Sequence, residues 1–219
     1  AVRISGVERA VFPTPSQVAV ALGDQSDTLL PHIGTTLGET IIGLLAGVIL
    51  GLGVAIVVAG WSLARRALEP LLVVIQTVPP IVLAPLLVLA LGFGWAPRIV
   101  VVMLVVFFPV TIAAAGAFLS ADPARRELAI GFGATRWQLM RHVTFPAALP
   151  AIFDGVRISA AYAVGAAAIA EQIGGARGGI GLFIARSQRN FRADQVLAGV
   201  AVIAALSVAL YVAVGWAAR

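Results

Sequence analysis

The 219-residue chain is 60% hydrophobic and 11% charged, with a mean hydropathy of +1.02, whereas soluble domains carry about 25% charged residues. It contains no cysteine and no lysine, which excludes disulfides, cysteine metal sites and a Walker A site with its essential lysine. The formal charge of +5 comes from arginines scattered between apolar segments, which favours anchoring at a membrane surface over nucleic-acid binding.

The N-terminal residues 1–32 are polar to mixed, and Pro13, Pro15 and Pro31 punctuate them. We do not expect this segment to cross a bilayer. The chain begins without a methionine and ends directly after its last apolar segment, so we expect residues to be missing at both ends.

Five later segments are apolar over at least the roughly 20 residues that a helix needs to cross a bilayer. Their continuous apolar runs differ from the alternating pattern of a membrane β-barrel. We therefore predict an all-α, polytopic transmembrane bundle with five spans. The predicted spans are about 33–60, 67–93, 96–118, 148–172 and 195–218.

The first predicted span, 33–60, carries Gly43, Gly47 and Gly51 at four-residue spacing. Small residues at this spacing allow two helix backbones to approach closely. The glycines therefore predict a tight helix contact, either inside one subunit or between two subunits.

The second predicted span, 67–93, is interrupted by Gln76-Thr77-Val78-Pro79-Pro80 and again by Pro85. Prolines remove backbone donors and kink helices, and irregular backbone at membrane depth has to face protein or a water-filled cavity. The interruption is therefore either a packing kink or part of a substrate path. A second kink at Phe108-Pro109 would lie near it if the two spans are antiparallel neighbours.

A polar loop, residues 119–148, separates the third and fourth predicted spans. Asp122-Pro123 predicts a helix start, because Asp can cap the first N–H groups and Pro suits the first helical position. Gly131 and Gly133 predict the end of this short helix.

A second short helix of the polar loop is predicted after Thr135, which has capping-box spacing to Gln138. We expect Phe145-Pro146 and Leu149-Pro150 to end this helix and begin the fourth span. Trp and Arg dominate binding hot spots, so the loop is either an interaction element or an amphipathic segment on lipid headgroups. Its candidate contact residues are Arg125, Arg126, Arg136, Trp137 and Arg141.

Four ionisable residues fall on apolar spans. Asp154 and Arg157 are three residues apart on one helix face and are expected to pair. Glu39 and Glu171 lie near span ends, and each is either a structural group or a residue of the translocation pathway.

Residues 174–192 open with glycine pairs and continue with apolar residues at helical spacing. These residues predict a short helix that lies in the membrane interface. Its apolar positions are Ile180, Phe183, Ile184 and Phe191.

No catalytic or metal-binding constellation is visible. His32 and His142 are far apart in the sequence, and neither a zinc-protease motif nor a nucleophile elbow is present. The sequence therefore disfavours an enzyme and predicts no metal site.

One further motif in the polar loop comprises Glu127, Ala129, Gly133, Val143 and Phe145-Pro146. This motif resembles the EAA loop of binding-protein-dependent ABC importer permeases. It departs from the usual pattern at Leu128, where a second alanine is common, and by Val143 and Phe145 in place of isoleucine and leucine. Further segments resemble the subgroup that imports nitrate, taurine, alkanesulfonates or thiamine-precursor pyrimidines: Val78-Pro79, Pro85-Leu86-Leu87, Phe108-Pro109, Gly155-Val156-Arg157 and Ala170-Glu171.

This resemblance implies a type I ABC importer permease in the bacterial inner membrane, with a sixth span before this chain. It implies a second permease copy, two cytoplasmic ATPase subunits that hold ATP and Mg, and an extracytoplasmic solute-binding protein. No nucleic acid and no cofactor of its own are expected. Residues 1–32 are then extracytoplasmic, 33–118 hold three spans, 119–148 form the cytoplasmic coupling loop, and 149–219 hold two spans flanking segment 174–192.

The resemblance also assigns roles to residues. The solute would be a small organic or inorganic anion such as a sulfonate or nitrate, or alternatively a thiamine-precursor pyrimidine or another small metabolite. A secondary transporter, a membrane enzyme and a purely structural membrane subunit are the competing classes. The ATPase-coupling residues would be Glu127, Ala129, Gly133, Arg136, Trp137, Arg141 and Pro146. The pathway residues would be Gln76, Thr77, Pro79, Pro80 and Glu171. Arg177, Arg186, Arg189 and Arg192 would then lie outside the cell, against the tendency for positive charge to stay inside.

Overall fold

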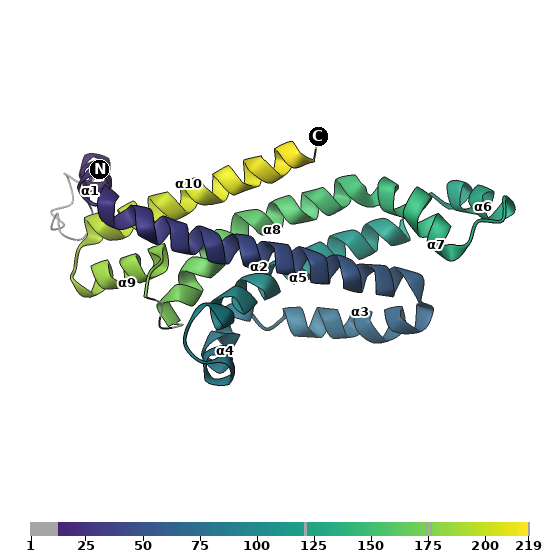
Figure 1. Cartoon of the computed structure of the whole chain (residues 1–219), viewed down its shortest axis with the longest axis horizontal. Helices are drawn as coiled ribbons and strands as arrows, with labels where there is room; N and C mark the ends of the chain where they lie inside the picture. Colours follow the sequence, from purple (N-terminus) through teal and green to yellow (C-terminus); the bar gives the residue numbers. More distant parts are fainter. Residues whose placement is uncertain (1–12, 121, 174, 176, 219) are drawn as a thin grey trace, which may run out of the picture.

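The computed structural model describes residues 13–120, 122–173, 175 and 177–218, and the described elements are helical (Figure 1). The all-α prediction is confirmed. In chain order the elements are α1 (Pro15–Asp24), α2 (Ser26–Gly60), α3 (Ser62–Gln76), the 3₁₀ helix η1 (Pro80–Leu83), α4 (Ala84–Leu91), α5 (Trp95–Leu119), α6 (Pro123–Gly131), α7 (Arg136–Leu139), the π-helical turn η2 (Met140–Thr144), α8 (Phe145–Ile173), α9 (Ile180–Arg189) and α10 (Ala193–Ala217).

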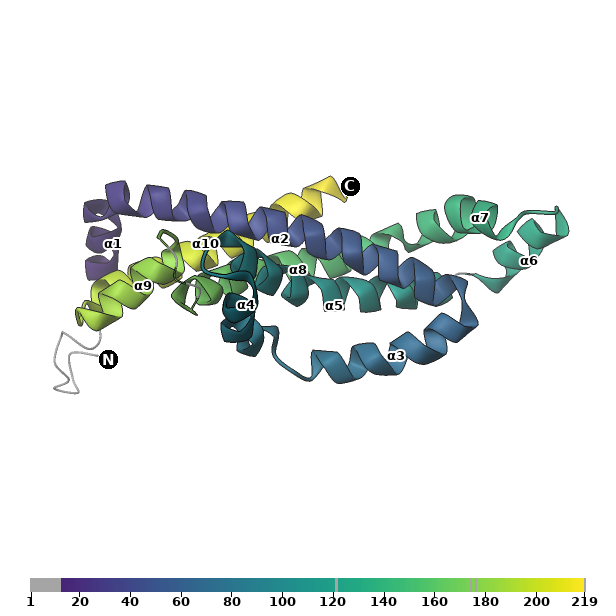
Figure 2. The ribbon, with the colours of Figure 1, turned by 60° about the horizontal axis from the view of Figure 1, so that its bottom comes forward.

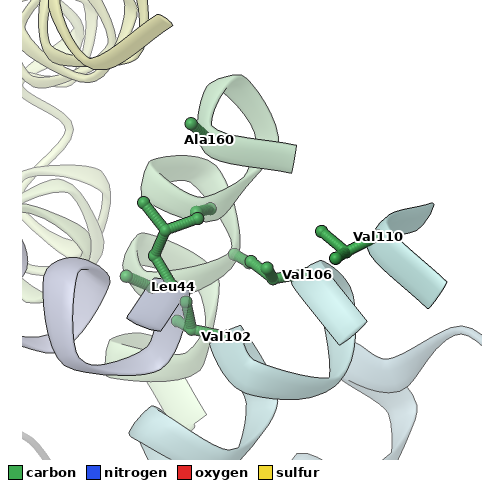
Figure 3. Packing of buried hydrophobic residues seen from close by; sticks show 8 residues of the cluster. Leu44, Val102, Val106, Val110 and Ala160 are labelled. Carbon is green, nitrogen blue, oxygen red and sulfur yellow. The ribbon is translucent and has the colours of Figure 1, made fainter. Parts of the chain in front are cut away.

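Helices α2, α5 and α8 form the centre of the bundle, and α10 packs along α8 (Figure 1). Alanine and valine side chains fill the space between the three central helices, where Leu44, Val106 and Ala160 belong to one buried cluster (Figure 3). Because lipid tails are as apolar as these side chains, close van der Waals packing holds such helices together. Small residues at the interface make that packing possible.

The glycine stripe of α2 provides the closest helix contact. A methyl group on Gly43 would lie 2.6 Å from Val102 Cβ, and one on Gly47 would lie 2.7 Å from the Met103 carbonyl oxygen. Gly51 is similarly close to α5, with 3.1 Å to the Phe107 carbonyl oxygen. These glycines therefore serve packing between α2 and α5 of one chain. Of the two interpretations that the sequence allows, a contact inside one subunit is the one that the structure shows.

The second predicted span, 67–93, is not one helix. Helix α3 ends at Gln76, a short turn follows, and the chain resumes as η1 and α4. Pro79 and Pro80 have no N–H to continue the α3 hydrogen bonds, and Pro80 instead begins the 3₁₀ turn. In the described part of the chain, four helical stretches are long and apolar enough to cross a membrane, beginning at Ser26, Trp95, Arg136 and Ala193.

The broken segment approaches the bundle near the start of α5. Ile81 and Ala84 pack with Val101, whereas Pro109 lies eight residues further along α5. The two proline sites therefore do not face each other as expected. Helix α3 bows away from the bundle in Figure 2.

The two ends of the bundle are distinct. Helices α6 and α7 project from one end, which also holds the turn between α2 and α3 (Figures 1 and 2). Helices α1 and α9 lie at the opposite end. Helix α2 starts at Ser26, before the expected boundary at residue 33, and includes Pro31 within its first turns.

Helix α9 uses its apolar face differently from the expectation. Ile180, Phe183 and Ile184 are buried with Leu29 in one cluster, so protein and not lipid covers this face. Phe191 does not join it: it follows the helix with a positive φ of 54° and is 89% exposed.

The expected pair of Asp154 and Arg157 is also absent from the described residues. Asp154 is exposed, whereas the Arg157 guanidinium lies 4.0 Å from the centre of the Tyr211 ring on α10. A cation–π contact with a neighbouring helix replaces the local ion pair, because Arg157 points toward α10.

Candidate functional site

Helix α6 of the polar loop begins and ends as its sequence predicts. The Asp122 carboxylate accepts a hydrogen bond from the Ala124 N–H at 3.0 Å. At the other end, the Ala134 N–H donates to the Ala129 carbonyl and the Gly133 N–H donates to the Ile130 carbonyl. This pair of bonds is a Schellman motif, which needs a left-handed residue, and Gly133 supplies it with a φ of 81°.

Helix α7 starts with the predicted capping box. The Gln138 N–H donates to Thr135 Oγ1 at 3.3 Å, and the Thr135 N–H donates to Gln138 Oε1 at 2.8 Å. Both bonds satisfy N–H groups that a helix start leaves without partners.

The second loop helix does not end at Phe145-Pro146 or Leu149-Pro150. It passes through η2 into α8, and the helical stretch runs from Arg136 to Ile173 over 38 residues. A π-helical turn shifts the hydrogen-bond register by one residue, and Pro146 falls in the first turn of α8, where the sequence placed a break. The polar loop is therefore continuous with a central helix of the bundle.

The polar loop exposes apolar side chains together with arginines. Trp137 is 66% exposed and Phe132 is 85% exposed, and Arg136 and Arg141 are exposed beside them. Such a mixture is typical of binding hot spots. The predicted residues Glu127 and Pro146 are also exposed, and Ala129 is half-buried.

Sequence reasoning missed Phe132 and Leu128 as candidate contact residues. Phe132 stands between two glycines at the end of α6, and its side chain is 85% exposed. In the sequence Leu128 stands out only as a departure from the motif, but its side chain is 65% exposed.

A second set of polar residues lies inside the opposite half of the bundle. Glu39 of α2 is fully buried and forms an ion pair with Arg98 Nη1 of α5, and Arg98 Nε donates to the Gly94 carbonyl at 2.7 Å. Arg98 was not predicted. A buried acid needs a partner, and Arg98 is the only basic residue between Arg66 and Arg125.

Glu171 joins three helices. Its Oε1 accepts from Thr36 Oγ1 of α2 and its Oε2 accepts from the Gly181 N–H of α9, each at 2.6 Å. The Gly179 N–H donates to His32 Nδ1 at 2.8 Å. Gly179 has a φ of 115°, and a side chain there would collide with the Glu171 carboxylate, so the chain needs glycine at this position.

The predicted pathway residues separate into two places. Thr77 and Pro79 lie in the exposed turn between α3 and η1, where Thr77 Oγ1 donates to the Val74 carbonyl at 2.7 Å. Gln76 ends α3 and Pro80 begins η1. Glu171 is instead buried against α2 and α9. The neighbouring Ala170, not Glu171, packs with Ala84 of α4.

A bundle of membrane-length helices with an ordered polar loop at one end defines a multi-pass membrane protein. The chain belongs to the family described as binding-protein-dependent transport system inner membrane component, which matches residues 43–219. It is thus an ABC importer permease, a multi-pass protein of the bacterial inner membrane.

Curated relatives carry transport names. A probable ABC transporter permease protein of Haemophilus influenzae is 32% identical over 206 residues, which cover 94% of this chain and 84% of the relative. The formylaminopyrimidine transport permease protein of Halalkalibacterium halodurans is 32% identical over 205 residues, which cover 93% of this chain and 82% of the relative. The taurine transport system permease protein of Escherichia coli is 32% identical over 203 residues, which cover 90% of this chain and 74% of the relative.

Solved structures support the fold. The inward-facing MetNI methionine ABC transporter in one crystal form contains a chain that matches with a TM-score of 0.79 at 20% identity. The match covers 90% of this chain and 97% of that one. At this identity the likeness concerns the fold.

Proposed function

We propose that this chain forms a dimeric permease in which ATP hydrolysis by two cytoplasmic partner subunits drives import of a small solute. An extracytoplasmic binding protein would deliver the solute. Family membership supports the partnership with a binding protein, and the absence of lysine means that a Walker A site has to reside on another subunit.

The observation that carries this proposal is the construction of the polar loop. Two capped helices expose Phe132 and Trp137 at the end of the bundle, and the second runs directly into α8. A partner subunit that moved the loop would move α8 with it, because no flexible linker separates them. Closure of the ATPase subunits would thereby tilt central helices and shift the opening from outside to inside.

For the solute we propose a small organic or inorganic anion, such as a sulfonate or nitrate. The names of relatives include taurine and aliphatic sulfonate transport, and they also include formylaminopyrimidine and riboflavin transport. A thiamine-precursor pyrimidine is therefore the second candidate. Transport without an ATPase, as in a secondary transporter, is the remaining alternative. None of these four relatives is named as a secondary transporter.

The test is reconstitution of the chain with its partner ATPase and binding protein in proteoliposomes. Replacing Gly133 by valine forces a side chain into the left-handed position of the Schellman motif. We expect this variant to lose solute uptake and to lose the stimulation of ATP hydrolysis by the loaded binding protein. The control is Gly131→Ala, at a helical glycine with no atom within 4 Å of the added methyl group.

Two results would count against the proposal. Uptake by the wild-type chain without any ATPase would favour a secondary transporter. Normal uptake and normal stimulation in the Gly133→Val variant would remove the coupling role of the polar loop.

A further inference from the structure

A cavity of about 710 Å³ opens at the end of the bundle opposite the polar loop. The start of α2, the start of α5 and the connection between α8 and α9 surround it, and these elements can be followed in Figures 1 and 2. Its volume lies in the range of small-molecule sites. The chemically distinctive lining residues are His32, Phe93, Trp95, Arg98, Arg177 and Arg186.

The charge of this cavity has one sign. Its lining includes three arginines and no acidic residue. Arg98 is neutralised by Glu39, but no carboxylate of the described residues lies within ion-pair distance of Arg177 or Arg186. The nearby acid Glu171 is engaged by Thr36 and Gly181. The two outer arginines therefore leave a net positive cavity.

Two aromatic rings form the apolar part of the wall, and each lies close to a glycine. The Trp95 ring lies against Gly38, where an added methyl group would be 3.3 Å from Cη2. The Phe93 ring lies similarly close to Gly175, at 2.5 Å from such a methyl group. Trp95 is 48% exposed and Phe93 is 79% exposed, so both rings can contact the flat or apolar part of a ligand.

His32 adds a defined donor. Its Nδ1 accepts from the Gly179 N–H, so in the neutral ring the proton resides on Nε2. The second ring nitrogen can therefore donate a hydrogen bond. With the two guanidinium groups, the cavity presents several donors and a positive charge.

We propose that this cavity is a binding site for a small organic anion, whose sulfonate or carboxylate group contacts Arg177 and Arg186 while its apolar part contacts Phe93 and Trp95. The assignment of this site to the solute entrance rests on the proposed function, which places this end outside the cell. The solute released by the binding protein would meet this site before the pathway. The arginines would then serve the solute, which accounts for positive charge on the outer side.

The probe for the experiment is benzenesulfonate, compared with neutral benzenesulfonamide. Binding is measured by titration calorimetry on the full chain in phosphatidylcholine nanodiscs, without ATP and without the binding protein. We expect benzenesulfonate to bind and benzenesulfonamide to bind much more weakly. The double variant Arg177→Gln with Arg186→Gln should weaken benzenesulfonate binding by at least about tenfold, since hydrogen bonds to charged groups contribute strongly to affinity.

The matched control is Arg189→Gln. Arg189 lies on the same helix as Arg186, is also exposed and is not among the residues that line the cavity. We expect the Arg189→Gln variant to bind benzenesulfonate with the same affinity as the wild-type chain. Equal weakening by all these variants would indicate a diffuse surface charge and overturn the proposal, as would unchanged affinity in the double variant.

A lipid phosphate is the other possible source of an anionic group. Nanodiscs that contain phosphatidylglycerol distinguish the two, because loss of benzenesulfonate binding there would assign the cavity to lipid and overturn the solute site. If ATP hydrolysis is coupled to uptake but benzenesulfonate does not bind, the anion site is wrong and the proposed function stands. Binding that persists in a chain without coupled hydrolysis would support the site and count against the proposed function.

Discussion

Glu39 of α2 and Arg98 of α5 form an ion pair in the interior of the bundle, where both side chains are almost completely buried. The pair joins the two helices that also share the glycine contact. Taking both charges out of water is costly, and the geometry repays this cost only while both partners are present.

Replacing Arg98 by methionine should therefore destabilise the protein strongly, by about 3–5 kcal/mol, because Glu39 would stay buried without a counter-charge. The measurement is unfolding in bicelles by titration with a denaturing detergent. The double variant Glu39→Leu with Arg98→Met should recover most of the loss. Equal stability of the single and double variants would contradict this account.

The α2–α5 contact predicts different effects on stability for two glycines of α2. Gly47→Ala places a methyl group 2.7 Å from the Met103 carbonyl oxygen and should cost about 1–3 kcal/mol of stability. Gly53→Ala meets no atom within 4 Å and should be neutral or slightly stabilising. The same detergent titration compares the two variants, and the absence of any difference would show that α2 and α5 can separate easily.

The Glu171 carboxylate should fix the start of α9. In Glu171→Ala, the Gly181 N–H loses its partner and the Thr36 hydroxyl keeps only the His32 carbonyl, so we expect a local loss of about 1–3 kcal/mol. Hydrogen exchange of segment 179–184, followed by mass spectrometry, should accelerate accordingly. Gln172→Ala, at the exposed neighbouring position, should leave the exchange unchanged. Slow exchange in both variants would show that packing alone holds α9.

The capping box of α7 predicts a smaller, local effect. Thr135→Ala removes the side-chain acceptor of the Gln138 N–H and should cost about 1 kcal/mol, seen as faster exchange at residues 137–139. Thr135→Ser keeps the hydroxyl and should restore slow exchange. If serine and alanine behave alike, the cap contributes nothing to the order of the loop.

Local signals predicted the loop helices well. The cap at Asp122, the Schellman turn at Gly133 and the capping box at Thr135 each depend on residues a few positions apart, so their spacing was visible in the sequence. The apolar runs of the first, third, fourth and last spans were equally visible, because each is continuous in the chain.

Other features depended on contacts between distant segments. The partners of Glu39 and Glu171 lie on other helices, and no local spacing relates Glu39 to Arg98 or Thr36 to Glu171. The apolar face of α9 has the same pattern whether lipid or protein covers it, so its burial at Ile180 depended on tertiary structure. The prolines after Phe145 and Leu149 do not break the helix: Pro146 directly follows the π turn that shifts the hydrogen-bond register, and Pro150 lies inside α8.

The unbroken stretch from Arg136 to Ile173 makes one rod of about 57 Å, since each helical residue adds 1.5 Å. Its first residue lies in the polar loop, and Glu171, which holds α9, lies near its last. If the rod turns about its middle by about 5°, each tip moves by roughly 2.5 Å, in opposite directions. Hydrogen bonds of 2.6 Å at Glu171 cannot stretch by that distance without breaking. A push on the polar loop would therefore decide, at the other end of the helix, whether Glu171 stays bonded to α9 or releases it.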